Sequence, residues 1–206
     1  VRNSVVAGIT VNGGSPALSA VTLSGNSGPG MLVSAGSPTV SGSTVSSNTS
    51  HGLNVSGGSV DISSTSITGN GNYAISAVAS SPLTTLTGLT VSGNGPGKDL
   101  IEKTAGTISS SQTWPLASVP YVLTGTVYVQ GTGTPVLTIQ PGVTVKFNSA
   151  AELVISYTAP GALQAVGTSG SPILFTANGS TTPGFWKGLY IGNTTPATAT
   201  QISYAT

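Results

Sequence analysis

A repeat with a period of 22 runs through the first half of the chain and constrains the fold more than any other feature of the sequence. One column of the repeat is apolar and comprises Ile9, Met31, Leu53 and Ile75. Another column is asparagine, with successive spacings of 22, 22 and 24, and comprises Asn26, Asn48, Asn70 and Asn94. A period of about 20–50 residues indicates a solenoid, whose units stack because no single unit can bury its apolar face alone.

Within each repeat, apolar residues alternate with small polar ones, as in Ile9–Val11 and Val21–Leu23. Alternation of this kind is typical of a β-strand, whose successive side chains point to opposite faces. Clusters of Gly, Asn, Pro and Ser separate three such segments in each repeat. The sequence therefore predicts an all-β parallel β-helix with three short strands and about 22 residues per coil. Aliphatic side chains stack inside it and hydroxyl groups cover the outside.

The asparagine column predicts a buried ladder at a turn. Asparagine tolerates left-handed backbone geometry, and its amide can bond to the amides above and below it. A ligand-binding role for the same four residues is the alternative, and it is less favoured because buried amides are usually satisfied within the protein.

The periodicity suggests three segments. Residues 1–97 form regular coils with the ladder, 98–119 an irregular bridge, and 120–206 a second β-helical segment. The bridge holds four charged residues, expected to pair on a solvated surface: Lys98, Asp99, Glu102 and Lys103. Strand-like runs in the rest of the chain are Tyr121–Gln130, Val136–Gln140, Val143–Phe147, Glu152–Ser156, Gly161–Val166, Ile173–Ala177 and Lys187–Ile191.

The second half of the chain resembles an element of secreted bacterial right-handed β-helix repeat proteins. The longest run that carries this resemblance is Leu137–Phe147, with the sequence LTIQPGVTVKF. Shorter stretches extend it over about residues 113–191: Thr113–Pro115, Pro120–Leu123, Gly161–Ala165, Ser171–Thr176 and Pro183–Leu189. The resemblance implies a right-handed helix, secretion and an extracellular or cell-surface location. It does not specify an activity, because such modules occur in adhesins and other surface proteins alike.

Composition argues against several classes of function. Only 4% of the residues are charged and the net charge is +1, which gives no electrostatic attraction for nucleic acid or an anionic membrane. No apolar run is long enough to predict membrane insertion. The four carboxylates, Asp61, Asp99, Glu102 and Glu152, are not paired by the repeat, as an acid–base site would require. The single histidine, His51, is expected to be exposed at a turn and cannot form a zinc site without other ligands. We therefore expect no enzyme, catalytic residue, metal site or cofactor.

The sequence at each end of the chain has the alternation of a β-strand and lacks a polar capping segment. If Thr206 were followed by another Val1, Ile202 and Ala205 would fall into the apolar columns. The expected partner is therefore the protein itself, in repeats joined covalently or stacked end to end. This favours an extracellular structural module of a fibre or long surface protein.

Two alternatives use the outer surface. An adhesin that binds glycans could stack sugars on Trp186 and Tyr190, although packing at coil edges is the favoured role of Trp114 and Trp186. An ice-binding protein could use ranks of outward hydroxyl groups, although serine interrupts the threonine that such surfaces favour. The residues of the two ranks are Thr22, Thr44, Ser66 and Thr90, and Ser24, Ser46, Thr68 and Ser92.

Overall fold

A computed structural model describes residues 1–194 and 199–206, and the strands that pair in it do so in parallel. The chain divides into two compact units, Val1–Glu102 with Ala117–Val119, and Lys103–Leu116 with Pro120–Thr206. Three strands make one coil in each unit. The fold class predicted from the sequence, an all-β parallel β-helix, is confirmed.

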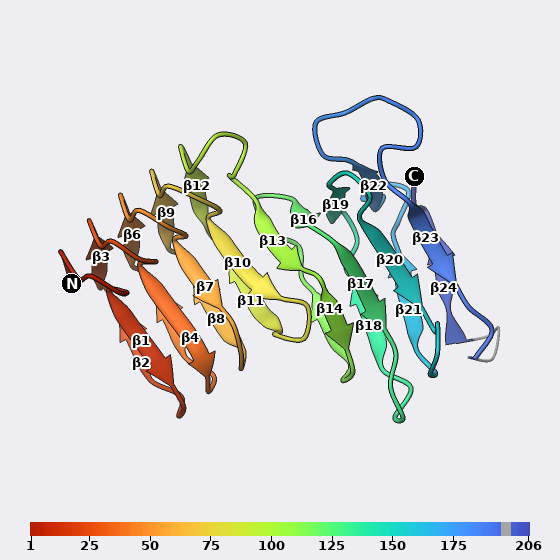
Figure 1. Ribbon diagram of the computed structural model, residues 1–206, viewed down its shortest axis with the longest axis horizontal. Helices are drawn as coiled ribbons and strands as arrows, with labels where there is room; N and C mark the ends of the chain where they lie inside the picture. Colours follow the sequence, from red (N-terminus) through yellow and green to blue (C-terminus); the bar gives the residue numbers. More distant parts are fainter. Residues whose placement is uncertain (195–198) are drawn as a thin grey trace. The chain divides into compact units, whose positions relative to one another are not determined.

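The first unit contains four coils, which lie side by side in Figure 1 from red to yellow. Their strands are β1 (Ile9–Asn12), β2 (Ala17–Ser19) and β3 (Thr22–Ser24); β4 (Met31–Ala35), β5 (Thr39–Ser41) and β6 (Thr44–Ser46); β7 (Leu53–Val55), β8 (Val60–Ser63) and β9 (Ser66–Thr68); and β10 (Ile75–Val78), β11 (Leu83–Thr87) and β12 (Thr90–Ser92). Every third strand belongs to one sheet, which gives the orders β1-β4-β7-β10, β2-β5-β8-β11 and β3-β6-β9-β12.

The register of the first unit explains the sequence repeat. Ile9 pairs with Met31, Met31 with Leu53, and Leu53 with Ile75. The last three of these side chains are completely buried. Each apolar column therefore forms one stripe of the core, and burial of that stripe stabilises the stack.

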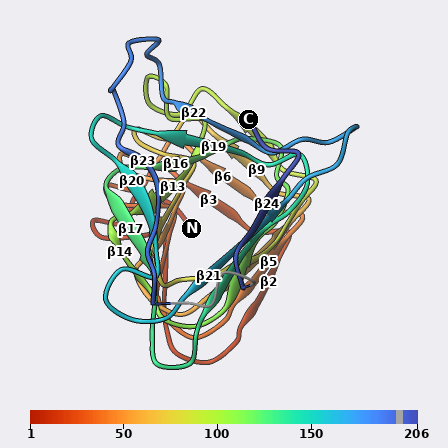
Figure 2. The same cartoon turned by 90° about the vertical axis from the view of Figure 1, so that its right-hand side faces the viewer.

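The second unit follows the same plan, and Figure 2 shows its three sheets as three sides around a core. β13 (Ile101–Thr104) spans the division between the units. The remaining strands are β14 (Gly106–Ile108), β15 (Gln112–Trp114), β16 (Tyr121–Leu123), β17 (Thr126–Val129), β18 (Val136–Ile139), β19 (Thr144–Phe147), β20 (Glu152–Ile155), β21 (Ala162–Val166), β22 (Leu174–Ala177), β23 (Gly188–Ile191) and β24 (Gln201–Ser203). Two sheets have the orders β14-β17-β20-β23 and β15-β18-β21-β24, and β19 pairs with β16 and β22 in the third.

Two features of the second unit differ from the expectation. The stretch 98–119 is not irregular: β14 and β15 lie in it and pair in register with β17 and β18. Gly106 pairs with Val127, whereas Gln112 pairs with Leu137, so the two sheets do not share one spacing. The coils also lengthen, because Gln164 pairs with Gln201. A fixed period fails here because loops of different length join the strands.

Candidate functional site

The four asparagines of the predicted column form a continuous hydrogen-bonded ladder in the first unit. Each side-chain amide donates to the Oδ1 atom of the next asparagine, at 2.7 Å from Asn26 to Asn48 and at 2.8 Å for the next two steps. The backbone N–H of each donor residue bonds to the same Oδ1 atom. Each amide also donates to a backbone carbonyl. The ladder is buried and internally satisfied, which leaves its amides engaged in the fold.

Asp99 ends this ladder, a role that sequence reasoning missed. Its Oδ1 atom accepts from the Asn94 side chain at 2.8 Å and from the Asn94 backbone N–H at 2.9 Å. Its Oδ2 atom accepts from the Gly93 backbone N–H at 3.0 Å. The only signal in the sequence was an acidic residue five positions after the last asparagine.

A glycine column makes room for the ladder. A Cβ atom on Gly30 would lie 2.8 Å from the Asn48 side-chain nitrogen and 2.4 Å from a methyl group of Val45. The same atom on Gly8 would lie 2.8 Å from the Asn26 side-chain nitrogen. These distances are too short for a carbon atom, so close approach favours glycine at Gly8 and Gly30, whereas the fourth coil has Ala74 at the corresponding position.

The other charged residues of the expected surface cluster also have specific contacts, so solvated surface pairing was the wrong interpretation. Lys98 donates to the Tyr73 hydroxyl at 2.7 Å and lies 3.9 Å from the centre of its ring. The Glu102 carboxylate accepts from the Ser76 hydroxyl at 2.6 Å. These groups belong to the first unit and lie on its last coils.

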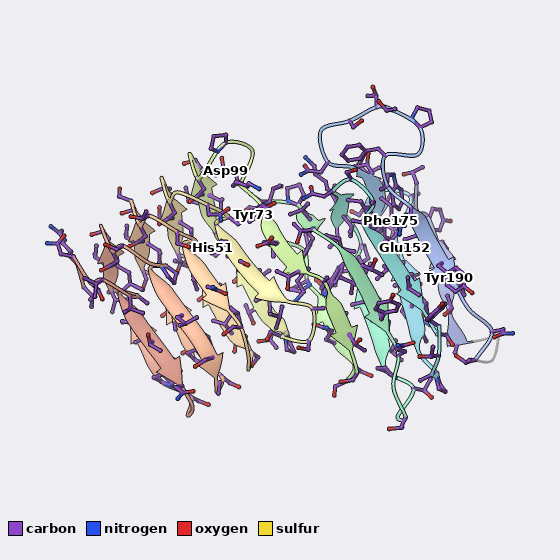
Figure 3. All side chains as sticks on the ribbon, viewed as in Figure 1. His51, Tyr73, Asp99, Glu152, Phe175 and Tyr190 are labelled. Carbon is purple, nitrogen blue, oxygen red and sulfur yellow. The ribbon has the colours of Figure 1, made fainter. Side chains whose placement is uncertain are left out.

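His51 is half-buried rather than exposed, and its ring stacks on Tyr73 with 6.2 Å between centroids. Figure 3 labels both residues on the first unit. Burial lowers the pKa of His51, and the charge of Lys98 lowers it further, whereas Glu102 acts in the opposite direction. The neutral imidazole is therefore the form that the fold favours.

Lys103 is the most deeply buried charged residue among those that the structure describes, with no exposed surface. Burial lowers its pKa from 10.5 to about 7. The ammonium form loses its hydration when the second unit folds, and this favours the neutral amine.

The predicted hydroxyl ranks lie on the sheet β3-β6-β9-β12. Register pairs align the members of each rank directly. The first rank is Thr22, Thr44, Ser66 and Thr90, and the second is Ser24, Ser46, Thr68 and Ser92. All eight residues are exposed or half-exposed. Serine lacks the methyl group that a regular threonine rank would present, so neither rank has a uniform surface.

An aromatic recess occupies the outer face of the sheet β14-β17-β20-β23. Its volume is about 240 Å³, and its lining residues are Tyr128, Glu152, Val154, Tyr157 and Tyr190. Val154 is the register partner of Tyr128 on one side and of Tyr190 on the other. Figure 3 shows Glu152 and Tyr190 on neighbouring strands. We call this site the tyrosine recess.

Three rings line the tyrosine recess at different angles. Tyr128 and Tyr157 have centroids 6.0 Å apart and tilted planes, and Tyr157 and Tyr190 have centroids 5.8 Å apart in an edge-to-face arrangement. Tyr157 is supplied by the loop that follows β20. Of the two residues predicted to stack on sugars, Tyr190 lies in this recess.

Trp186 does not line the recess. Its ring stacks on Phe147, with 4.1 Å between centroids, and the side chain is half-buried. Trp114, which was expected to pack at a coil edge, is 1% exposed and stacks on Tyr121 at 5.3 Å. The Tyr121 hydroxyl donates to the Pro115 carbonyl at 2.8 Å. Both tryptophan rings therefore pack against other aromatic rings of the fold.

Acidic and metal-ligating side chains are dispersed. In residues 1–194 and 199–206, no group of three His, Cys, Asp or Glu side chains lies close enough to hold a metal ion. Asp61 accepts from Thr84, Asp99 ends the ladder, Glu102 contacts Ser76, and Glu152 lies in the tyrosine recess. No helix in the described part of the chain is long and apolar enough to cross a membrane.

Comparison with known families agrees with the architecture. Residues 2–113 match the family described as a right handed beta helix region. Residues 106–205 match a second family, described as a pectate-lyase like beta helix domain. No curated protein and no solved structure matches the chain.

Proposed function

The chain belongs to the right-handed β-helix family, and from this premise we propose that it is an extracellular structural module that extends a β-solenoid end to end. Its partner in this proposal is the protein itself, either as further repeats of one long chain or as identical subunits. The fold is consistent with such a structural or surface role.

The observation that carries the proposal is an apolar column that reaches the edge of its sheet uncovered. Trp114, Ile139 and Ala165 are successive register partners and are at most 1% exposed. Ile202 continues this column on β24, the edge strand, and is 40% exposed. A further coil on β24 would bury Ile202 as the inner coils bury the other three.

The first unit presents a similar edge. Ile9 on β1, the edge strand of its sheet, is half-buried, whereas its register partner Met31 has no exposed surface. Edge strands carry unpaired backbone groups as well, which makes them templates for a further parallel strand. Apolar side chains beside an open edge favour continuation of the stack.

The interior supplies the rigidity that a structural module needs. Parallel backbone hydrogen bonds and the asparagine ladder both run from coil to coil, which is the direction in which a further coil would extend the solenoid. The proposal is non-catalytic, because Asp61, Asp99 and Glu102 are each engaged by hydrogen bonds within the fold and Glu152 lies in a separate recess. β-Helix domains of the pectate-lyase-like kind occur in enzymes as well as non-enzymes, so the absence of catalysis is part of what we propose.

Sedimentation velocity of the whole chain over a range of concentrations tests this proposal. We expect association that weakens when Ile202→Arg places a charge at the end of the column. Leu174→Arg is the matched control, because Leu174 has the same 40% exposure but pairs with the outward Thr144. A chain that stays monomeric, or equal effects of the two variants, would rule out assembly through this column.

A further inference from the structure

We propose that the tyrosine recess binds a neutral sugar ring. This goes beyond the structural role, because it assigns the outer face of the sheet β14-β17-β20-β23 to a ligand while the edges extend the solenoid. The recess lies on the outer face of that sheet with Tyr190 on its edge strand β23, and separate variants test the two roles.

The arrangement of the rings is the first argument. Tyr157 and Tyr190 are large apolar side chains that are nevertheless 55% and 45% exposed. Tyrosine presents an apolar ring with a polar tip, which suits a partner that is apolar on one face and polar at its rim. A pyranose ring has this character, since its C–H groups line the faces and its hydroxyl groups point outward. Because the rings of Tyr157 and Tyr190 are edge-to-face, such a sugar could contact one ring with its face and the other with its rim.

The rigid support beneath the rings is the second argument. Tyr128 and Tyr190 lie on strands on either side of β20, and Val154 between them is 3% exposed. Sites built on strands hold their contacting groups in place better than sites on loops. The volume of about 240 Å³ is below the roughly 300–1,000 Å³ of sites for drug-sized ligands. The recess therefore accommodates one sugar unit at a time, with the rest of a chain outside it.

Glu152 supplies the polar group. Its carboxylate accepts no hydrogen bond and forms no ion pair within residues 1–194 and 199–206, so it is available to accept from sugar hydroxyls. Lys187 precedes Gly188, the register partner of Glu152, but Lys187 and Glu152 form no ion pair in the described structure. A negative charge at the recess repels an acidic sugar such as a uronate. The ligand class is therefore neutral.

Isothermal titration of the whole chain with cellotetraose, chitotetraose and mannotetraose tests the proposal, with trigalacturonate as the acidic comparison. We expect saturable binding of at least one neutral probe and weaker binding of trigalacturonate. Tyr190→Ala and Tyr157→Ala should each lower the affinity about tenfold, which corresponds to the loss of one aromatic contact. Glu152→Gln should weaken neutral binding and reduce the discrimination against trigalacturonate.

Tyr204→Ala is the matched control, because Tyr204 is a 63% exposed tyrosine of the same unit that does not line the recess. It should bind like the unaltered chain. The thermal unfolding midpoint of each variant, followed by circular dichroism, separates lost binding from lost structure. Absence of saturable binding by all three neutral probes up to ~10 mM, or wild-type affinity in a folded Tyr190→Ala variant, would overturn the assignment. Either result would leave the assembly through Ile202 unaffected.

Discussion

The Asn94 side-chain amide donates a 2.8 Å hydrogen bond to the Asp99 carboxylate, and this contact ends the ladder of buried asparagines. The same carboxylate accepts from two backbone N–H groups, those of Gly93 and Asn94. Hydrogen bonds to an ionised acceptor are shorter and stronger than bonds between neutral groups. A single acidic residue thus satisfies the three donors that the last coil of the ladder would otherwise leave open.

We predict that Asp99→Ala lowers the free energy of unfolding by about 2 kcal/mol, because three donors lose a charged acceptor in a partly buried site. Asp99→Asn should cost less, since its one oxygen can still accept. Urea unfolding followed by circular dichroism measures both. Asp61→Ala, which removes the acceptor of the Thr84 hydroxyl on the surface, is the control and should cost less than about 1 kcal/mol. Equal costs at Asp99 and Asp61 would contradict the role of Asp99.

Asn48→Ala should be more harmful, because it interrupts the ladder in the middle. The Asn26 side chain and its backbone N–H both lose the acceptor on Asn48. The Asn70 oxygen and the Leu23 carbonyl each lose the donor that the Asn48 side-chain amide supplies. Buried groups left without partners cost about 1–3 kcal/mol each, so the total loss should be about 3 kcal/mol or more. Asn54→Ala, at a half-buried position on β7, is the matched substitution and should stay within about 1 kcal/mol. Chemical denaturation of the two variants decides between a ladder and a row of independent side chains.

Gly30→Ala tests the close approach that the glycine column permits. The new Cβ atom would meet a Val45 methyl group at 2.4 Å and the Gly52 carbonyl oxygen at 2.9 Å. Overpacking of this kind costs about 1–3 kcal/mol. Gly133→Ala is the control, because nothing lies within 4 Å of its added atom, and it should be neutral or slightly stabilising. A thermal midpoint for Gly30→Ala equal to that of Gly133→Ala would show that the column tolerates a side chain.

Lys103 should make stability depend on pH. Its pKa is about 7 in the folded chain and 10.5 as its ordinary value, so between these pH values the unfolded chain binds more protons. Stability therefore rises with pH in this window and is lost as pH falls from 10.5 towards 7. From pH 7 to pH 9 the free energy of unfolding should increase by about 2 kcal/mol. Lys103→Met should flatten this increase, and an unchanged slope in that variant would refute the assignment to Lys103.

The regular part of the fold could be predicted because the chain repeats its geometry there. In the first unit, register partners in the column from Ile9 to Ile75 keep one constant spacing, so sequence columns and physical columns coincide. In the second unit, loops of different length join the strands. Gln164 and Gln201 are neighbours across a sheet although they lie far apart in the sequence. No fixed period can reveal such a pair.

The same reason explains what was missed at the candidate sites. Tyr190 stood out as a surface aromatic, but Tyr128 lies two strands away across β20, and Tyr157 comes from a loop. Only the register brings the three rings and Glu152 together. His51 was misread because the Tyr73 ring that stacks on it comes from the next coil. Burial of an isolated polar residue depends on the coils that stack on it rather than on its own sequence context.

The central claim, a module that continues as a solenoid, is tested most directly by cryo electron microscopy of the native material together with its mass under denaturing conditions. We predict filaments whose axial layers repeat at about 4.8 Å, the spacing of hydrogen-bonded strands. A denatured mass equal to one chain would then indicate stacked subunits, and a much larger mass a covalent tandem array. Discrete single particles without filaments, at a mass of one 20.1 kDa chain, would contradict the claim.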